Sequence, residues 1–534
     1  MPTDFISYRE TGYFSDFISD YLDEKPYLKD FYNRFPTLEN FEAQIEEKRH
    51  SEFMSESHRK VLFDTLKTQY QNIETSVLTL KNIENLKANN TFTITTGHQL
   101  NLFTGPLYFL YKIISTINLT KELKAKYPNY NFVPIYWMAS EDHDFEEINY
   151  FNFKGKKIQW NSDQTGAVGH FKTEGLKAVF NVVSAEFGPG KHAEQLKNWF
   201  KEAYINQDNL ADATRCLANQ LFGEYGLVVL DADDKALKHQ FIPQMKKELI
   251  EQVAFKTVSE TNNKLEKLDL TIQVNPRKIN LFYIKDGLRE RIVEIEGEYS
   301  VLDTDINWDK NELLKHLNEF PERFSPNVIM RPLYQEVILP NLCYIGGGGE
   351  LIYWLQLKSN FEAHEVTFPM LLLRNSALIK TQKQSEKLKK LNISDSDLFL
   401  DRASFINKKV REISNIDIDF SEQVNHLVKQ FENLYQLAEK TDKSFLGAVK
   451  AQEVKQLKGL KHLEKRLLNA QKKKLADQIE RCTELQEQLF PNQSLQERNT
   501  NFSELYLEFG DNLIPQLIKV LEPLKREFLI LNLK

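Results

Sequence analysis

Polar side chains gather between a predicted strand and a predicted helix in the stretch TFTITTGHQLNLFTGPLYFLYKIISTINL, residues 91–119. The pair Gly105-Pro106 is typical of a helix start, because proline at the first helical position loses no needed donor. Backbone N–H groups, the helix dipole and a lysine on the polar helix face predict an anion site. An ordinary strand–helix connection is the alternative interpretation. The candidate binding residues are Gly97, His98, Gln99, Asn101, Tyr108 and Lys112.

Three acidic residues and a histidine follow soon after a second apolar segment, residues 132–139. Such side chains could perform acid–base work, bind a magnesium ion or hold a substrate amine. A zinc site is not favoured, because four adjacent residues cannot all converge on one tetrahedral ion. The alternative is that acids simply stabilise the first turn of the following helix. The four residues are Glu141, Asp142, His143 and Asp144.

Four consecutive glycines lie between an apolar segment and a helix expected to begin with Glu350. Glycine lets the backbone approach a ligand with no Cβ in the way, which predicts a close ligand, with a flexible turn as the alternative. No Gly-Lys-Ser/Thr follows, so the run is not a P-loop. The arginine that ends the last predicted strand could bind phosphate or carboxylate, or could cap a domain junction. The candidates in this region are Arg331, Glu336, Gly346, Gly347, Gly348, Gly349, Glu350, Arg374 and Asn375.

The elements that must position these residues are short strands separated by helical patterns, between residues 89 and 375. Their alternation predicts an α/β fold, a mostly parallel sheet with helices on its faces and with connecting insertions. In such a sheet, ligands bind beyond the carboxyl ends of the strands, which is where the candidate residues fall. The predicted strands are 91–96, 132–139, 226–232, 327–333 and 368–373.

The remaining chain is predicted to be helical. Residues 1–88 are expected to form an N-terminal helical part on the core, and residues 491–534 C-terminal helices that return to it. Between 376 and 490, apolar residues at heptad spacing predict a coiled-coil domain. This domain is either an antiparallel helical hairpin or a hairpin that pairs with a second subunit. The seam consists of Phe420, Val424, Leu427, Phe431, Leu434 and Ala438.

The composition indicates a folded protein of two or three domains, with 41% hydrophobic and 12% aromatic residues in a chain of 534. A formal net charge of -7 argues against a surface that attracts nucleic acid or an anionic membrane. No apolar run reaches the roughly 18–20 residues that span a bilayer, so we expect a cytoplasmic protein. Cys216, Cys343 and Cys482 are too far apart for a CxxC site, and the last two are expected to be packed thiols.

Four segments of the chain together resemble the bacillithiol-biosynthesis cysteine-adding enzymes, the BshC family. The resemblance extends over essentially the full length, coiled coil included. One departure is His98, where the family commonly has glutamine, while Gln99 still matches. The four segments are TTGHQLNLFTGPLYFLYK, VPIYWMASEDHDFEEI, MRPLYQEVILPNLCYIGGGGELIYW and SLQER.

The resemblance implies a Rossmann-like core, akin to that of class I aminoacyl-tRNA synthetases, and a coiled-coil domain that helps to form a homodimer. The implied activity is that of a ligase that joins the carboxyl group of cysteine to the amino group of glucosaminyl malate, the last step of bacillithiol biosynthesis. Because a carboxylate does not form an amide unaided, ATP is expected to activate it, with Mg2+ as a candidate ion.

We expect the following roles for the candidate residues. Donors in the 97–112 region, assisted by Arg331 or Arg374, would stabilise negative charge that develops on phosphorus. The glycine run would carry the nucleotide. The acidic cluster would hold the glucosamine amine and remove its proton, a role that suits a histidine because it titrates near neutrality. The residues expected to act on the reacting groups are Gln99, Asp142, His143 and Asp144.

Two functions of other classes also fit the sequence. The segment from Lys455 to Lys474 holds eight Lys/Arg against one acid, Glu464, so a nucleotide-binding core with a basic coiled coil could bind RNA. A solvated helix face explains that charge more simply. The other reading is a non-catalytic coiled-coil scaffold, and the polar clusters at several strand ends argue against it.

Overall fold

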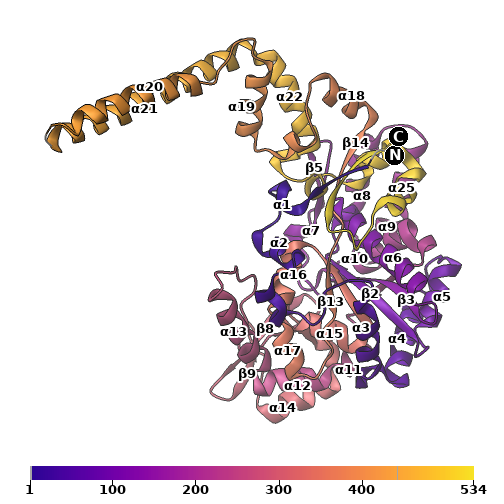
Figure 1. Ribbon diagram of the computed structural model, residues 1–534. Helices are drawn as coiled ribbons and strands as arrows, with labels where there is room; N and C mark the ends of the chain where they lie inside the picture. The colour runs from indigo at the N-terminus through magenta and orange to yellow at the C-terminus, as the bar shows by residue number, and fades with distance from the viewer. Residues whose placement is uncertain (1–2, 442, 534) are drawn as a thin grey trace. The chain divides into compact units, whose positions relative to one another are not determined.

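The computed structural model describes residues 3–441 and 443–533 (Figure 1). The chain forms two compact units. The first contains the residues up to Ile379 together with those from Gln496 onward, and the second is Lys380–Leu495. The sequence had placed these two boundaries at 376 and 490. Within the described residues, no helix is long and apolar enough to cross a membrane.

A five-stranded parallel sheet forms the centre of the first unit, as the sequence predicted. Its strands, in spatial order, are β13 (Met370–Leu373), β12 (Asn341–Gly346), β2 (Thr91–His98), β3 (Asn131–Met138) and β6 (Val228–Asp231). From β2 the chain adds β3 and β6 on one side, and later β12 and β13 on the other. The ends of β2 and β12 therefore flank a topological switch point, the place where open α/β sheets leave a crevice for ligands.

One predicted strand, residues 327–333, is wrong, because most of it lies in a helix, α15 (Met330–Ile338). Its apolar residues Met330, Leu333, Tyr334 and Val337 recur at a spacing of three and four, which is helical and not alternating. Proline at the third position of this helix costs little, because the first-turn N–H groups have no partner within the helix. The strand of this region is β12, which comes just after α15 in the chain.

Helices and smaller sheets surround the parallel sheet. After β3 comes a hairpin of β4 (Tyr150–Phe153) and β5 (Lys156–Gln159), and before β12 an antiparallel sheet of β7 (Leu281–Lys285), β8 (Leu288–Ile295), β9 (Glu298–Val301), β10 (Asn307–Trp308) and β11 (Phe324–Pro326). The connecting helices are α6 (Tyr108–Lys126), α7 (Phe145–Ile148), α8 (Leu176–Phe187), α9 (Lys191–Tyr204), α10 (Leu210–Phe222), α11 (Lys235–Gln240), α12 (Ile242–Glu251), α13 (Val253–Glu266), α14 (Lys310–Glu319), α16 (Gly348–Leu355) and α17 (Lys358–Ala363).

The two ends of the chain complete the first unit. The N-terminal part is mainly helical, with α1 (Tyr8–Thr11), α2 (Asp16–Leu22), α3 (Asn40–Arg49), α4 (Glu56–Gln69) and α5 (Val77–Asn85) after the strand β1 (Thr3–Ser7). The C-terminal part contains α23 (Gln496–Asn499), α24 (Phe502–Phe509), α25 (Leu513–Val520) and β15 (Glu527–Leu533). The sequence predicted helices there but not β15, which pairs antiparallel with β1 and neighbours β14 (Ala377–Thr381).

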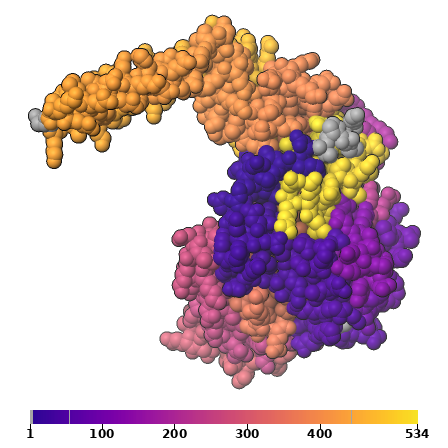
Figure 2. Space-filling model, viewed as in Figure 1, coloured from indigo at the N-terminus to yellow at the C-terminus, as the bar shows by residue number. Residues whose placement is uncertain are grey.

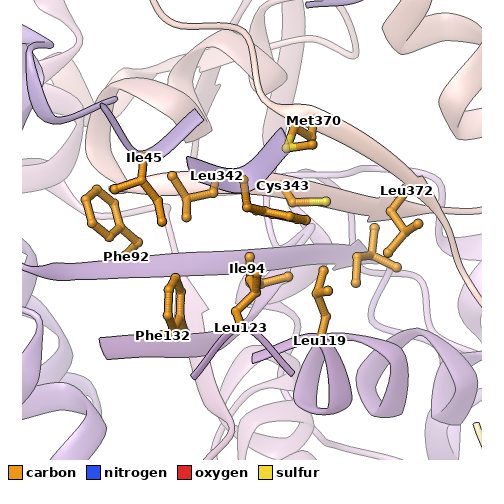
Figure 3. Close-up of a cluster of buried hydrophobic side chains, with 12 residues drawn as sticks. Ile45, Phe92, Ile94, Leu119, Leu123, Phe132, Leu342, Cys343, Met370 and Leu372 are labelled. Atoms are coloured by element: carbon orange, nitrogen blue, oxygen red, sulfur yellow. The ribbon is translucent and has the colours of Figure 1, made fainter. Parts of the chain in front are cut away.

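Buried apolar side chains fix α3 and α6 against the parallel sheet (Figure 3). Phe92 and Ile94 of β2 pack with Leu342 of β12, and Leu119 of α6 closes the cluster. Cys343 belongs to the same cluster and is fully buried, which confirms the expectation of a packed thiol. Burial raises the pKa of this thiol well above its ordinary value, so it is no nucleophile at neutral pH.

The second unit is helical apart from the end of β14. Its helices are α18 (Gln382–Lys390), α19 (Arg402–Ile413), α20 (Ser421–Ala438), α21 (Lys443–Lys474) and α22 (Ala476–Leu489). Helices α20 and α21 form an antiparallel hairpin, an element that both predicted arrangements contain (Figure 1). Pairing of the hairpin with a second subunit stays a prediction. Of the predicted seam, Phe431 and Ala438 are buried against Val449 of α21, whereas Leu434 is 39% exposed. In the space-filling view the hairpin is a slender arm, so many of its side chains face solvent (Figure 2).

A buried ion pair ties α3 to α15 in the first unit. Lys48 Nζ lies 3.2 Å from Glu336 Oε2, and both side chains are 0% exposed. The other carboxylate oxygen of Glu336 accepts hydrogen bonds from Asn341 Nδ2 (2.7 Å) and Gln335 Nε2 (3.1 Å). Glu336, a candidate binding residue in the sequence, is therefore fully occupied by structural partners.

Removal of Lys48 should destabilise the first unit, because it leaves the Glu336 carboxylate buried without a cation. We expect Lys48→Met to lower the free energy of unfolding by about 3–5 kcal/mol, and the double variant Lys48→Met/Glu336→Leu to recover part of the loss. Chemical denaturation followed by circular dichroism measures both. The control is Lys60→Met, which removes only an exposed pair with Asp64 on α4. Equal stability of Lys48→Met and Lys60→Met would contradict the expectation.

Candidate functional site

A cavity of about 380 Å³ lies at the switch point, beyond the ends of β2 and β12. Three loops predicted from the sequence meet there: the one after β2, the one after β3 and the glycine run after β12. Arginine side chains of α15, of the segment after β13 and of α23 complete the wall. The predicted site residues that line this cavity are Gly97, His98, Gln99, Tyr108, Lys112, Asp142, Arg331, Gly347, Gly348, Gly349, Glu350 and Arg374.

Lys112 of α6 joins the two strand ends at the floor of the cavity. Its ammonium donates to the backbone carbonyl of Gly97 at 2.7 Å and lies 2.5 Å from Glu350 Oε2 on α16. Glu350 also accepts from the backbone N–H of Gly347 (2.7 Å) and from the hydroxyl of Tyr344 (2.8 Å). Burial alone would raise the pKa of Glu350, but Lys112 and these hydrogen bonds hold it below its ordinary value. Lys112 therefore links Gly97 of β2 to Glu350 of α16 and also lines the cavity.

His98 presents an unpaired acceptor to the cavity. Its Nδ1 lies 2.7 Å from the carbonyl oxygen of Gln99, so Nδ1 carries the proton and Nε2 is an acceptor. Nε2 is buried and has no hydrogen-bond partner. Burial and the charge of Lys112 lower the pKa of His98 to about 3, so the ring is neutral near pH 7. A neutral imidazole here can accept a hydrogen bond from a ligand but cannot supply positive charge for an anion.

Arg374 is held by an ion pair that leaves one donor free. Its Nη2 lies 2.8 Å from Glu497 Oε1, and Nη1 donates to Asn375 O and Ser376 Oγ, both at 2.9 Å. Its Nε is buried with no partner. The guanidinium also lies over the ring of Tyr108, 5.0 Å from the centroid. This arrangement places one N–H of Arg374 where a carboxylate or phosphate oxygen could accept it.

The loop after β3 brings only Asp142 of its four polar residues to the cavity. Gln99 Nε2 donates to Asp142 Oδ2 (3.2 Å) and the His143 backbone N–H to Oδ1 (2.8 Å). Burial would raise the pKa of Asp142, but these bonds and the charge of Arg331 bring it well below its ordinary value. Asp142 can therefore hold an ammonium group, yet it is a poor base near neutral pH.

The other predicted residues lie outside this cavity. Glu141 is buried in an ion pair with Lys238 (2.6 Å), which also binds Asp233 (2.6 Å). His143 is exposed and accepts from Arg289 Nη1 at 2.7 Å. Asp144 is exposed at the start of α7. The remaining residues outside the wall are Asn101, Glu336, Gly346 and Asn375.

Glycine is required in the 346–349 run partly by internal packing. A Cβ at Gly346 would lie 3.0 Å from the Tyr344 ring and 3.1 Å from Glu350 Cβ. Glycine is needed here so that these two side chains can pack against the backbone, and not so that a ligand can approach it. A Cβ at Gly347 would meet Glu350 at 3.4 Å, whereas one at Gly349 would meet nothing within 4 Å. The backbone N–H of Gly347 is already taken by Glu350. A Cβ at Gly348 would lie 3.3 Å from Ile18 Cγ1, so the close approach of a ligand is left to Gly349.

Several residues of the wall escaped the sequence reasoning. Arg498 was seen only as part of SLQER, and it comes from α23, far from the other loops in sequence. Tyr344 and Trp354, stacked with ring centroids 4.5 Å apart, flank the glycine run, and aromatic residues so close to it were the available signal. The unpredicted lining residues are Trp137, Ala139, Val328, Pro332, Gln335, Tyr344, Tyr353, Trp354 and Arg498.

The fold defines an α/β protein with a Rossmann-like core and a helical coiled-coil domain. Residues 1–375 match the family model "Bacillithiol biosynthesis BshC, N-terminal Rossmann-like domain", and residues 377–533 match "Bacillithiol biosynthesis BshC, C-terminal coiled-coil domain". The chain belongs to this bacillithiol biosynthesis BshC family.

Curated relatives agree over the whole length. A protein of Christiangramia forsetii named "Putative cysteine ligase BshC" is 61% identical, covering 100% of this chain and 99% of the relative. One of Flavobacterium johnsoniae with the same name is 60% identical, with 100% of both chains covered. A solved structure, described as a putative arginyl-tRNA synthetase from Campylobacter jejuni, covers 84% of this chain at 11% identity with a TM-score of 0.21, which is too low to support an argument.

The neutral His98 should make the protein less stable as the pH falls. In the unfolded chain a histidine titrates near 6.5, so between about pH 6.5 and 3 the unfolded state binds a proton that the folded state does not. The stability that the neutral His98 ring contributes at neutral pH is therefore lost as the pH falls. Between pH 7.5 and pH 5, the native protein should lose about 2 kcal/mol more than the variant His98→Gln.

Urea denaturation at the two pH values measures this difference. His50→Gln, which changes an exposed histidine at the end of α3, is the control and should keep the pH dependence of the native protein. Parallel pH profiles for the native protein and His98→Gln would show that His98 is not the buried neutral group described.

Proposed function

We propose that this protein is a ligase that joins the carboxyl group of cysteine to the amine of glucosaminyl malate, with bacillithiol as the product. Two facts support the proposal: membership of the bacillithiol biosynthesis BshC family, and close relatives named as cysteine ligases. The observation that carries it from the structure is the charge of the cavity at the switch point.

The wall of this cavity contains more positive than negative side chains. Lys112, Arg331, Arg374 and Arg498 face Asp142 and Glu350. Glucosaminyl malate carries two carboxylates and one ammonium, and so has the opposite imbalance. Among the described residues, the guanidinium of Arg331 has no hydrogen bond or ion pair, and Arg374 Nε is also without a partner. These two donors match the two carboxylates, and Asp142 matches the ammonium.

Activation of the cysteine carboxyl group is the remaining requirement, and we propose that ATP provides it. Gly349 offers backbone that a phosphate can approach, and Lys112 lines the same cavity. In the described residues, no group of three or more His, Cys, Asp or Glu side chains could hold a metal ion. A magnesium ion would therefore be held mainly by the phosphates of ATP and by water, as is common for this ion.

Mass spectrometry of the purified protein with cysteine, glucosaminyl malate, Mg2+ and ATP tests the function. We expect bacillithiol, with AMP if the intermediate is an acyl-adenylate and ADP if it is an acyl-phosphate. Asp142→Asn should lower kcat/KM by about a hundredfold or more, because the amine loses its counter-ion. Asp144→Asn, whose exposed carboxylate does not line the cavity, is the matched control. No product with any nucleoside triphosphate, or equal rates in both variants, would count against the proposal.

We further propose that the protein forms a homodimer through the hairpin of α20 and α21. The hairpin buries one set of apolar residues internally and exposes another, among them Leu437 (52%) and Leu446 (40%) near its tip. Apolar residues repeated along an exposed arm favour contact with a second copy, and closed two-fold dimers are the commonest outcome for such chains.

Sedimentation equilibrium measures the oligomeric state. The double variant Leu437→Glu/Leu446→Glu should be monomeric, because burial of two carboxylates in an apolar interface is costly. Lys450→Glu, an exposed polar change on the same arm, should remain dimeric. A native protein that sediments as a monomer at all concentrations, or a dimer that survives the double substitution, would exclude this interface.

A further inference from the structure

A second cavity of about 400 Å³ adjoins the first one in the same unit. Three residues, Gln99, Tyr108 and Arg498, line both cavities and form the partition between them. The second cavity lies under the loop between β2 and α6, and its far wall is made by α7 and β4. It is open to solvent beside Glu147 and Arg498, which are both exposed. The proposed reaction joins two substrates and uses ATP, and the first cavity has been assigned to glucosaminyl malate and to the phosphates of ATP, which leaves cysteine without a site.

The charges of the second cavity differ from those of the first. Its wall contains one carboxylate, Glu147, and one guanidinium, Arg498, and the other polar groups are amides and phenols. Arg498 forms no hydrogen bond or ion pair with another described residue. Asn101 is only 9% exposed, and its Oδ1 is buried with no partner. One free cation, one anion and an unpaired buried acceptor describe a site for a small zwitterion.

Gln99, one of the residues of the partition, lies between the carboxylates of Asp142 and Glu147. The Gln99 amide donates to Asp142 Oδ2 at 3.2 Å on one side and to Glu147 Oε2 at 3.0 Å on the other. Each cavity thus has one carboxylate next to the same amide. Arg498 lines both cavities, so a carboxyl group held there borders the cavity that contains Asp142.

We propose that the second cavity is the cysteine site, with Glu147 binding the α-ammonium, Asn101 Oδ1 accepting from the same group, and Arg498 binding the carboxylate. The assignment rests on the proposed function for the identity of the amino acid. Glucosaminyl malate fits less well, because it has two carboxylates and this wall has a single guanidinium. Pro106 and Phe151 supply the apolar part of the wall for the thiol side chain.

Isothermal titration of the full-length protein with L-cysteine, under reducing conditions and without ATP, tests the assignment. The variant Glu147→Gln should weaken cysteine binding about tenfold or more, because an ammonium–carboxylate hydrogen bond is lost. Binding of glucosaminyl malate should not change. The matched control is Glu146→Gln, which alters the exposed neighbouring carboxylate that lines neither cavity. Thermal unfolding of each variant checks that the fold is intact.

Two analogues of cysteine test the proposed ammonium contact and the proposed carboxylate contact separately. 3-Mercaptopropionate lacks the ammonium, so it should bind the native protein and Glu147→Gln equally. Cysteamine lacks the carboxylate, so Arg498→Met should weaken cysteine binding but not that of cysteamine. Equal losses for cysteine and 3-mercaptopropionate in Glu147→Gln would overturn the assignment. So would a loss confined to glucosaminyl malate, which would make the second cavity the acceptor site, or no binding of cysteine to the native protein.

The outcomes also separate this assignment from the proposed reaction. If bacillithiol forms and Glu147→Gln keeps the native KM for cysteine, the reaction stands and the site is wrong. If no bacillithiol forms but cysteine binding still depends on Glu147 and not on Glu146, the site stands and the reaction is wrong.

Discussion

The buried cation of Lys112 is the interaction on which the arrangement of the site depends. An ammonium group 5% exposed is tolerated only because Glu350 lies 2.5 Å away and the Gly97 carbonyl accepts its proton at 2.7 Å. Removal of the Glu350 carboxylate would leave a buried charge uncompensated, which costs several kcal/mol. Gly97 is the penultimate residue of β2, and Glu350 lies in the first turn of α16, which begins at Gly348 and not at Glu350 as the sequence predicted. The Lys112 side chain therefore holds together the strand ends that flank the switch point.

Glu350 extends the same constraint to the glycine run. Its carboxylate binds Lys112, the Gly347 N–H and the Tyr344 hydroxyl together, so the start of α16 cannot shift without breaking all three. Tyr344 in turn stacks on Trp354. The run is therefore a fixed turn whose first glycines are needed for packing, and a simple flexible turn does not describe it.

The sequence predicted what local pattern controls and missed what distant segments contribute. Strand and loop signals located the parallel sheet and three of the loops around the cavity, because the strands are apolar runs and the loops carry Gly, Pro and acids. The helical spacing of Met330, Leu333, Tyr334 and Val337 was available but was read as a strand. Glu497 and Arg498 could not be placed by pattern. The ion-pair partner of Glu497 is Arg374, and the loops that share the first cavity with Arg498 also lie more than a hundred residues earlier in the chain. Local pattern also could not show that Glu141 pairs with Lys238 and does not face a ligand, because that depends on tertiary packing.

The division into two cavities bears on how a ligase of this kind could avoid wrong products. Both proposed substrates carry an amine and a carboxylate, so several amides could form from them. Which amide forms is decided by which carboxyl group lies at the boundary between the two cavities. On the proposed arrangement Arg498, which lines both cavities, presents the carboxyl group of cysteine at that boundary, whereas the carboxylates of glucosaminyl malate are held in the first cavity by Arg331 and Arg374. Both ammonium groups are then paired with a carboxylate, and an amine attacks only when it is neutral, so the amine of glucosaminyl malate must lose its proton before it reacts. Cysteine acts as the acyl donor on this arrangement because its carboxyl group, and not one of the two held in the first cavity, lies at the boundary.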